Sequence, residues 1–124
     1  MERITSYKQL IVWRKSMDLV EDVFNLTKSF PRTEDFSLTS QMRRAAVSIP
    51  SNIAEGFGRN SQREYTQFYA IAYGSALELE TQLLITERIG YSKNTLEIIS
   101  LLEEIQKMLS SLLRNNRTKT KRTN

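Results

Sequence analysis

Residues 96–113, LEIISLLEEIQKMLSSLL, form the clearest amphipathic run in this 124-residue chain. Apolar side chains recur in the run at steps of three and four residues, the spacing that places them on one face of an α-helix. The members of this stripe are Leu96, Ile99, Leu102, Ile105, Met108, Leu109, Leu112 and Leu113. Because an amphipathic helix must pack its apolar face against other elements, the run predicts a helical domain.

The same periodicity predicts three more helices upstream. The apolar stripe of the first is Leu10, Trp13, Met17, Val20, Phe24 and Thr27. This helix ends before Pro31, which pushes the preceding residue out of the helical conformation. The second contains Pro50, but its stripe continues in register to Ile53, so we expect a kinked helix rather than a break. Residues 61–64, Ser-Gln-Arg-Glu, form a capping box that begins the third.

The four predicted helices cover about residues 9–29, 36–55, 62–89 and 94–114. Short connections between helices favour antiparallel neighbours. The predicted fold is therefore all-α, an antiparallel up-down-up-down four-helix bundle in residues 1–113. We expect residues 114–124 to form a mobile basic tail, because they are polar and have nothing to bury.

Two residue types are missing from the composition, and their absence excludes several kinds of chemistry. The chain has no Cys, which excludes disulfides and thiol nucleophiles, and no His, the commonest acid–base catalyst near neutral pH and the commonest metal ligand. We expect no catalytic residue, no metal site and no cofactor. No apolar run approaches the roughly 20 residues of a membrane-spanning helix, and none resembles a signal peptide, so we expect a cytoplasmic protein.

The formal net charge of +4 is unevenly distributed along the chain. Residues 1–63 hold ten basic and seven acidic side chains, whereas residues 64–113 hold three basic and seven acidic. The tail contributes five cations and no acid: Arg114, Arg117, Lys119, Lys121 and Arg122. Such a segment can condense on nucleic acid without a fixed structure, and the alternative is a solubilising end with no partner.

Four further arginines are candidates for contacting nucleic acid. Arg43 and Arg44 lie on the second predicted helix, and Arg59 and Arg63 flank the Gly-containing turn after it. Guanidinium groups match phosphate in a bidentate manner, and the start of the third helix favours anions. The alternative is solvation with salt bridges to acids of neighbouring helices or subunits, which suits Arg43 and Arg44 better.

Three tyrosines recur every four residues beside this turn, at positions 65, 69 and 73. Aromatic rings next to cations can stack unpaired bases. A helical aromatic stripe is more often buried between helices, and we assign Tyr65, Tyr69 and Tyr73 to packing between helices or subunits.

Asn52, Glu55, Ser75 and Glu78 are polar residues near the small residues at the centre of the third helix. Glu55 and Glu78 could form a carboxylate pair, but catalysis would also require a shifted pKa and a cleft, which the sequence does not indicate. We interpret the four as a polar seam that fixes the register of the helices or the interface between subunits.

Residues 41–56, QMRRAAVSIPSNIAEG, followed by SQREY at 61–65 and FYAIAYGS at 68–75, resemble the signature of the bacterial four-helix-bundle proteins also called 23S rRNA intervening-sequence proteins. The resemblance extends from Leu10 to about Leu113. It implies an up-down bundle with Pro50 inside the second helix, and a homo-oligomer, since relatives are ring-shaped pentamers. Some members are encoded within insertions in ribosomal RNA genes, and none has established catalytic residues.

A more distant similarity links this fold to the accessory proteins of diversity-generating retroelements, which are basic pentamers that bind nucleic acid and a reverse transcriptase. The leading hypothesis is therefore a non-enzymatic oligomeric scaffold or adaptor that binds RNA or DNA through basic patches without sequence specificity. The alternative is a structural or protein-binding ring with no nucleic-acid role, and a distant third is a metal-dependent phosphohydrolase. The expected partners are further copies of the chain, RNA or DNA, and a protein that the sequence does not identify.

Overall fold

The computed structural model describes the backbone of residues 3–123 and the side chains of residues 3–115. Its four α-helices are α1 (Ile11–Thr27), α2 (Leu38–Phe57), α3 (Gln62–Arg88) and α4 (Leu96–Thr123). The short 3-10 helices η1 (Tyr7–Gln9) and η2 (Arg32–Glu34) precede α1 and α2. The described residues contain no strand, so the predicted all-α four-helix bundle is confirmed.

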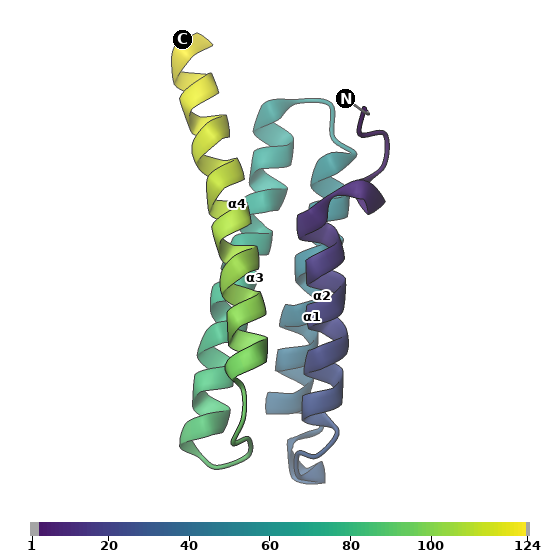
Figure 1. Ribbon diagram of the computed structural model, residues 1–124, viewed down its shortest axis with the longest axis vertical. Helices are drawn as coiled ribbons and strands as arrows, with labels where there is room; N and C mark the ends of the chain where they lie inside the picture. Colours follow the sequence, from purple (N-terminus) through teal and green to yellow (C-terminus); the bar gives the residue numbers. More distant parts are fainter. Residues whose placement is uncertain (1–2, 124) are drawn as a thin grey trace.

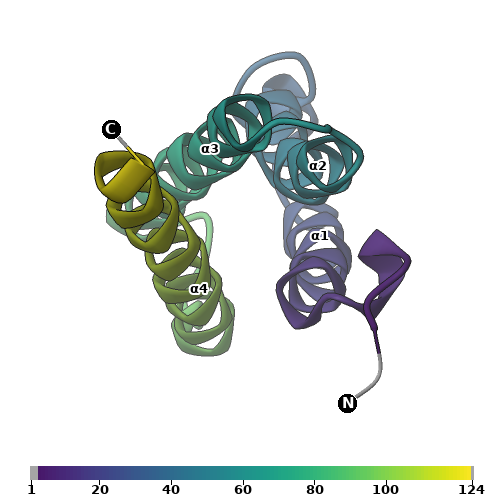
Figure 2. The same cartoon turned by 90° about the horizontal axis from the view of Figure 1, so that it is seen from above.

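Figure 1 shows the colours of the chain descending through α1, rising through α2, descending through α3 and rising through α4. Viewed from above, the helices follow one another around the bundle in chain order (Figure 2). The most extensive contact is between α2 and α3. The first and last helices, α1 and α4, also pack against each other, through a smaller contact. The turn between α2 and α3 therefore lies at the same end of the bundle as the end of α4.

All four helices contribute apolar side chains to one core. Its largest fully buried members are Leu19, Met42, Ile49, Ile53, Leu79, Leu83, Leu102, Ile105 and Leu109. Fully burying a side chain of this size contributes about 1.5–3 kcal/mol, so this set supplies much of the driving force for folding.

The core faces of α1 and α4 differ from the predicted stripes. In α1 the buried positions are Val12, Ser16, Leu19, Val23 and Thr27, so the core face is rotated by about one residue from the predicted one. Met17, predicted to be in the core, is 44% exposed. In α4, Leu96 is 77% exposed, and Ile98 is buried instead.

α2 continues through Pro50 as one helix, and Pro50 itself is buried. Its predicted kink stays a prediction. Near the end of α2, Gly56 allows close contact with α3, because a Cβ atom at this position would lie 2.8 Å from Cε1 of Tyr69. Glycine is therefore required here for packing rather than for an unusual backbone angle.

α4 continues to Thr123, beyond its predicted end near residue 114. Nothing in the sequence stops the helix, because residues 91–124 contain neither Gly nor Pro. Cations near a helix C-terminus also interact favourably with the helix dipole. The basic segment is thus part of a helix whose end projects past the turn between α2 and α3 (Figure 1), and its expected mobility stays a prediction.

Candidate nucleic-acid interface

The turn between α2 and α3 is built by local hydrogen bonds. The N–H of Gly58 bonds to the carbonyl of Ala54 at 3.2 Å and ends α2. Ser61 then begins α3, because its Oγ accepts the N–H of Glu64 at 3.2 Å. This bond is the Ser61 half of the predicted capping box, and it fixes the short loop that carries Arg59.

Arg59 and Arg63 occupy the two sides of this turn. Nη2 of Arg59 lies 3.3 Å from Oε2 of Glu55, one turn back along α2, and the guanidinium lies 4.6 Å from the centre of the Phe68 ring. Arg63 is exposed and has no hydrogen-bond or ion-pair partner among the described side chains. Because an exposed ion pair contributes at most about 1 kcal/mol, the Glu55 contact is weak enough to be exchanged for phosphate.

Arg43 has a different environment. Its Nε donates to Oγ1 of Thr27 at 2.9 Å, and its guanidinium lies 4.6 Å from the centre of the Phe24 ring. Both partners belong to α1, so Arg43 ties α1 to α2. These contacts are a hydroxyl and an aromatic ring rather than the salt bridge we expected, and a nucleic-acid contact of Arg43 stays a prediction.

Arg44 is exposed and separate from the turn. From Arg44 to the end of α2 at Phe57 the helix rises through 13 residues, or about 20 Å along the axis, and Arg59 lies beyond that end. Arg43 and Arg44 are therefore not brought together with Arg59 and Arg63.

The basic segment at the end of α4 lies at the same end of the bundle as the turn with Arg59 (Figure 1). Arg114 is exposed. The side chains of Arg117, Lys119, Lys121 and Arg122 lie outside the described residues. Two basic segments that are far apart in the sequence thus share one end of the molecule.

A polar groove lies between α3 and α4 below this end. It has a volume of about 210 Å³ and is lined by Tyr73, Gln106, Lys107, Ser110 and Arg114. From the sequence we expected Tyr73 to take part in packing, and we did not expect a site at Gln106, Lys107 or Ser110. The spacing of seven residues between Lys107 and Arg114, which places both on one helix face, is the signal that could have found the groove.

The tyrosines of α3 are packed against the bundle. Tyr69 is buried, and its ring centre lies 5.9 Å from that of Tyr65. Burial, with a smaller effect of the neighbouring Tyr65, raises the pKa of Tyr69. Tyr65 and Tyr73 are half-buried against the core. These contacts support the assignment of all three to packing.

The polar seam is smaller than the predicted set and includes a residue that the sequence analysis missed. Oγ of Ser48 lies 2.9 Å from Oγ of Ser75 and joins α2 to α3. Asn52 donates through Nδ2 to the carbonyl and to Oγ of Ser48, at 2.8 and 3.0 Å. Glu55 instead pairs with Arg59, so it belongs to the turn at the end of α2.

Glu78, the fourth member of the predicted seam, is exposed and accepts from Nε2 of the buried Gln82 at 3.3 Å. Glu55 and Glu78 therefore have separate partners, Arg59 and Gln82, and the described contacts do not join the two carboxylates. Ser48 could have been found from the sequence because it lies four residues before Asn52, a spacing at which two side chains on a helix are neighbours.

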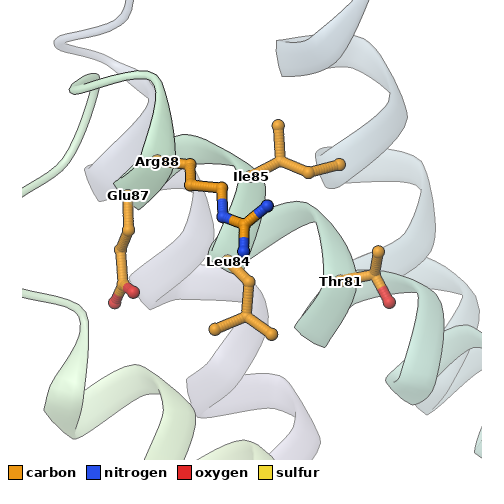
Figure 3. Close-up of a pocket in the computed structure, with 5 residues that line it drawn as sticks. All are labelled: Thr81, Leu84, Ile85, Glu87 and Arg88. Atoms are coloured by element: carbon orange, nitrogen blue, oxygen red, sulfur yellow. The ribbon is translucent and has the colours of Figure 1, made fainter.

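The outer face of α3, continued by Ile89 directly after the helix, carries exposed apolar side chains beside the charged Glu78, Glu87 and Arg88. Ile71, Leu77, Leu84, Ile85 and Ile89 are 41–52% exposed. Figure 3 shows the shallow pocket on the C-terminal part of this face, which has a volume of about 570 Å³. Its lining residues are Thr81, Leu84, Ile85, Glu87 and Arg88. We call the face formed by residues 70–89 on the outside of α3 the outer α3 face.

A second apolar groove lies between α1 and α2. It has a volume of about 340 Å³ and is lined by Tyr7, Trp13, Met17, Val20, Val47, Pro50, Ser51 and Ala54. Tyr7 packs edge-on against Trp13, with ring centres 5.2 Å apart. Met17 and Val47 remain more than two-fifths exposed in this groove. The molecule therefore presents apolar surface on two different sides.

Residues 8–111 match the sequence profile of the 23S rRNA-intervening sequence protein family. The match covers most of the chain, including the α2–α3 turn and all residues that line the α3–α4 groove except Arg114. The chain belongs to this family. The helices fold as the resemblance of residues 41–56 implied, with Pro50 inside α2.

A solved structure is also similar to this member of the family. It is a protein of unknown function from the S23 ribosomal protein family of Bacteroides thetaiotaomicron. The two chains are 27% identical, with a TM-score of 0.77, and the alignment covers 83% of this chain and 98% of the other. Comparison with curated proteins gives no match.

The intervening-sequence family and the solved relative are both of unknown function, and neither is a known enzyme. Among the side chains that the structure describes, no group of three or more Asp and Glu residues is placed to hold a metal ion. Within the same part of the chain, no helix is long and apolar enough to cross a membrane.

Proposed function

We propose that this chain is a non-enzymatic, homo-oligomeric scaffold that binds the phosphate backbone of RNA or DNA without reading its sequence. The observation that carries the proposal is the common location of two basic segments. Arg59 and Arg63 flank the α2–α3 turn, and the basic end of α4 projects past this same turn.

Charge along the chain supports a phosphate contact at this end. From residue 105 to residue 124 the sequence contains six cations and no acid. Electrostatic binding to phosphates needs cations, not a fixed constellation of side chains, and it is independent of base sequence. Residues 1–104 hold 12 basic and 14 acidic side chains, so the positive net charge of the protein comes from this C-terminal segment.

The outer α3 face supports assembly of several copies. A surface helix normally carries polar side chains on its solvent side, and a helix that is apolar on both sides is usually buried on both. The exposed Leu77 and Leu84 of this face are the kind of surface that marks a protein interface. By the family resemblance we expect a pentameric ring.

The composition supports a non-enzymatic role without a cofactor, since the chain lacks both His and Cys. We also place the scaffold in the cytoplasm, where it would meet RNA and DNA. The family name refers to 23S rRNA, and an RNA of this kind is one partner to which the basic end could bind.

The alternative is a ring that binds only protein, with a basic end that keeps it in solution. The specific observation that favours it is the apolar groove between α1 and α2, because this groove offers Trp13 and Met17 to a partner helix. The two functions differ in one respect, since only the first requires the cations of the α2–α3 turn and of the end of α4.

Charge reversal at each end of the bundle tests the proposal. The variant Arg59→Glu/Arg63→Glu removes two cations at the basic end, and the matched control Arg32→Glu/Lys93→Glu makes the same change in net charge at the opposite end. We expect the first variant to weaken binding of a labelled RNA about tenfold or more in a gel-shift titration, with the control near the wild type. Equal affinities for the wild type and both variants would contradict the proposal.

A further inference from the structure

The groove between α3 and α4 contains hydrogen-bond donors that the protein does not use. Lys107, Ser110 and the Tyr73 hydroxyl line it, and none of the three has a hydrogen-bond or ion-pair partner among the described residues. Gln106 donates weakly through Nε2 to the carbonyl of Ala76 at 3.5 Å. Arg114, at the upper end of the groove, is already engaged in an interaction.

This set of side chains fits an oxyanion. An ammonium group and two hydroxyls can donate to the oxygens of one phosphate, and no carboxylate lines the groove to repel it. A volume of about 210 Å³ suits a single phosphodiester group rather than an extended ligand. The groove between α1 and the start of α4 is different, because two carboxylates, Asp22 and Glu97, are among the residues that line it.

The register of α4 extends this donor set toward the end of the bundle. Positions 107, 114 and 121 are seven residues apart, which is almost two helical turns, so they share one helix face. Successive positions rise by about 10 Å along the axis. All three carry cations, and no acid follows Glu104 in the sequence. The groove is therefore followed on α4 by a row of basic sequence positions, which we call the basic face of α4; the side chains of this row beyond residue 115 lie outside the described residues.

We propose that this groove binds one phosphodiester group of a nucleic-acid strand, held by Lys107, Tyr73 and Ser110, and that the strand continues along the basic face of α4. The inference rests on the proposed function and adds a fixed contact site to it. Lys107 supplies the charge, and the two hydroxyls supply directional hydrogen bonds. Because α3 and α4 are rigid elements of the core, the first phosphate of the track is bound at a defined place.

The test uses the full chain and a fluorescein-labelled 20-nucleotide RNA of mixed sequence, with fluorescence anisotropy measured between 50 and 200 mM salt. Lys107→Gln removes the charge from the groove, and Lys93→Gln removes the same charge at the opposite end of the bundle. We expect Lys107→Gln to weaken binding about fivefold and to reduce the slope of log affinity against log salt by about 0.7. We expect Lys93→Gln to match the wild type.

Tyr73→Phe tests the hydroxyl separately, because it keeps the ring that packs on the core. We expect it to weaken binding about threefold with an unchanged salt slope, since it removes a hydrogen bond and no charge. Circular dichroism of each variant checks that the helices are intact, and Lys107 is exposed, so its substitution should leave the fold unchanged.

The outcomes separate the two proposals. Wild-type protein that binds neither this RNA nor a DNA strand of the same length would overturn the proposed function and this site with it. Two results would overturn the groove site but not the proposed function. In the first, Lys107→Gln binds RNA with the same affinity as the wild type. In the second, Lys107→Gln and Lys93→Gln weaken RNA binding equally. Saturation by inorganic phosphate below about 1 mM, lost in Lys107→Gln, would show a free-anion site and would also overturn the backbone contact.

Discussion

Gly56 of α2 lies directly against the ring of Tyr69 in α3, so close that a Cβ atom on Gly56 would be 2.8 Å from Cε1 of Tyr69. The contact is part of the most extensive helix pair in the bundle, and Tyr69 is 8% exposed. The close packing of α2 against α3 therefore depends on a glycine at position 56 and on the large ring of Tyr69 opposite it.

Gly56→Ala should destabilise the fold because the added methyl group must displace a packed ring. We expect the free energy of unfolding to fall by about 1–3 kcal/mol, measured by chemical denaturation. The control is Gly74→Ala, also within a helix, where a Cβ would meet nothing within 4 Å. Alanine there should raise stability by about 0.5–1 kcal/mol through helix propensity. If both substitutions changed the free energy of unfolding in the same direction, the close contact with Tyr69 would not explain the glycine at position 56.

Asp22 provides a prediction about pH. Asp22 is exposed overall, but partial desolvation, then the nearby Asp18, Glu21 and Glu97, raises the pKa of its carboxyl. A raised carboxyl pKa means that the folded state holds the proton more tightly than the unfolded state, so stability falls as pH rises from the usual carboxyl pKa of about 4 through the raised folded value. Asp22→Asn should therefore be more stable than the wild type at pH 7.

The advantage of Asp22→Asn should disappear when the pH is lowered below about 3.5, where the carboxyl is protonated in both states. Thermal unfolding of both proteins at several pH values measures this. Asp35→Asn, in the exposed loop before α2, controls for the removal of one acid from the chain. A gain of stability in Asp22→Asn that is constant from pH 3 to pH 7 would contradict the interpretation.

Leu84 tests the assembly of copies through the outer α3 face. This side chain is 51% exposed, so Leu84→Glu should leave the fold of one chain intact while placing a charge in the proposed interface. We expect the mass from light scattering to fall from that of the oligomer to that of the single chain, 14.4 kDa. Leu96→Glu, at a position that is 77% exposed at the start of α4, should not change the mass. An unchanged oligomer in Leu84→Glu would exclude this face.

The sequence predicted the number of helices and their order, but not every core face. In α1 the apolar residues occur as adjacent pairs, such as Val12 with Trp13 and Val23 with Phe24, so the periodicity fits two stripes one residue apart. The choice between them depends on where α2 and α4 pack against α1, which is a non-local property. Trp13 accordingly lines the α1–α2 groove instead of the centre of the core.

The candidate site was only partly predictable. An up-down topology is enough to bring Arg59 and the end of α4 to the same end of the bundle. Lys107 gave no separate signal, because a single lysine after Glu103 and Glu104 is typical of a solvated helix face. Its significance depends on the neighbouring α3, which places Tyr73 across the groove. Likewise, Ser48 and Ser75 meet only because α2 and α3 pack in one particular register.

The central claim is that the basic end of this bundle binds phosphates, and the salt dependence of duplex DNA binding by two chains tests it most directly. One chain is complete, and the other ends at Leu113. If all five cations after Leu113 contact phosphates, the slope of log affinity against log salt should be less steep by about 4.5 in the shorter chain. Equal slopes for the two chains, or binding by neither, would contradict the account.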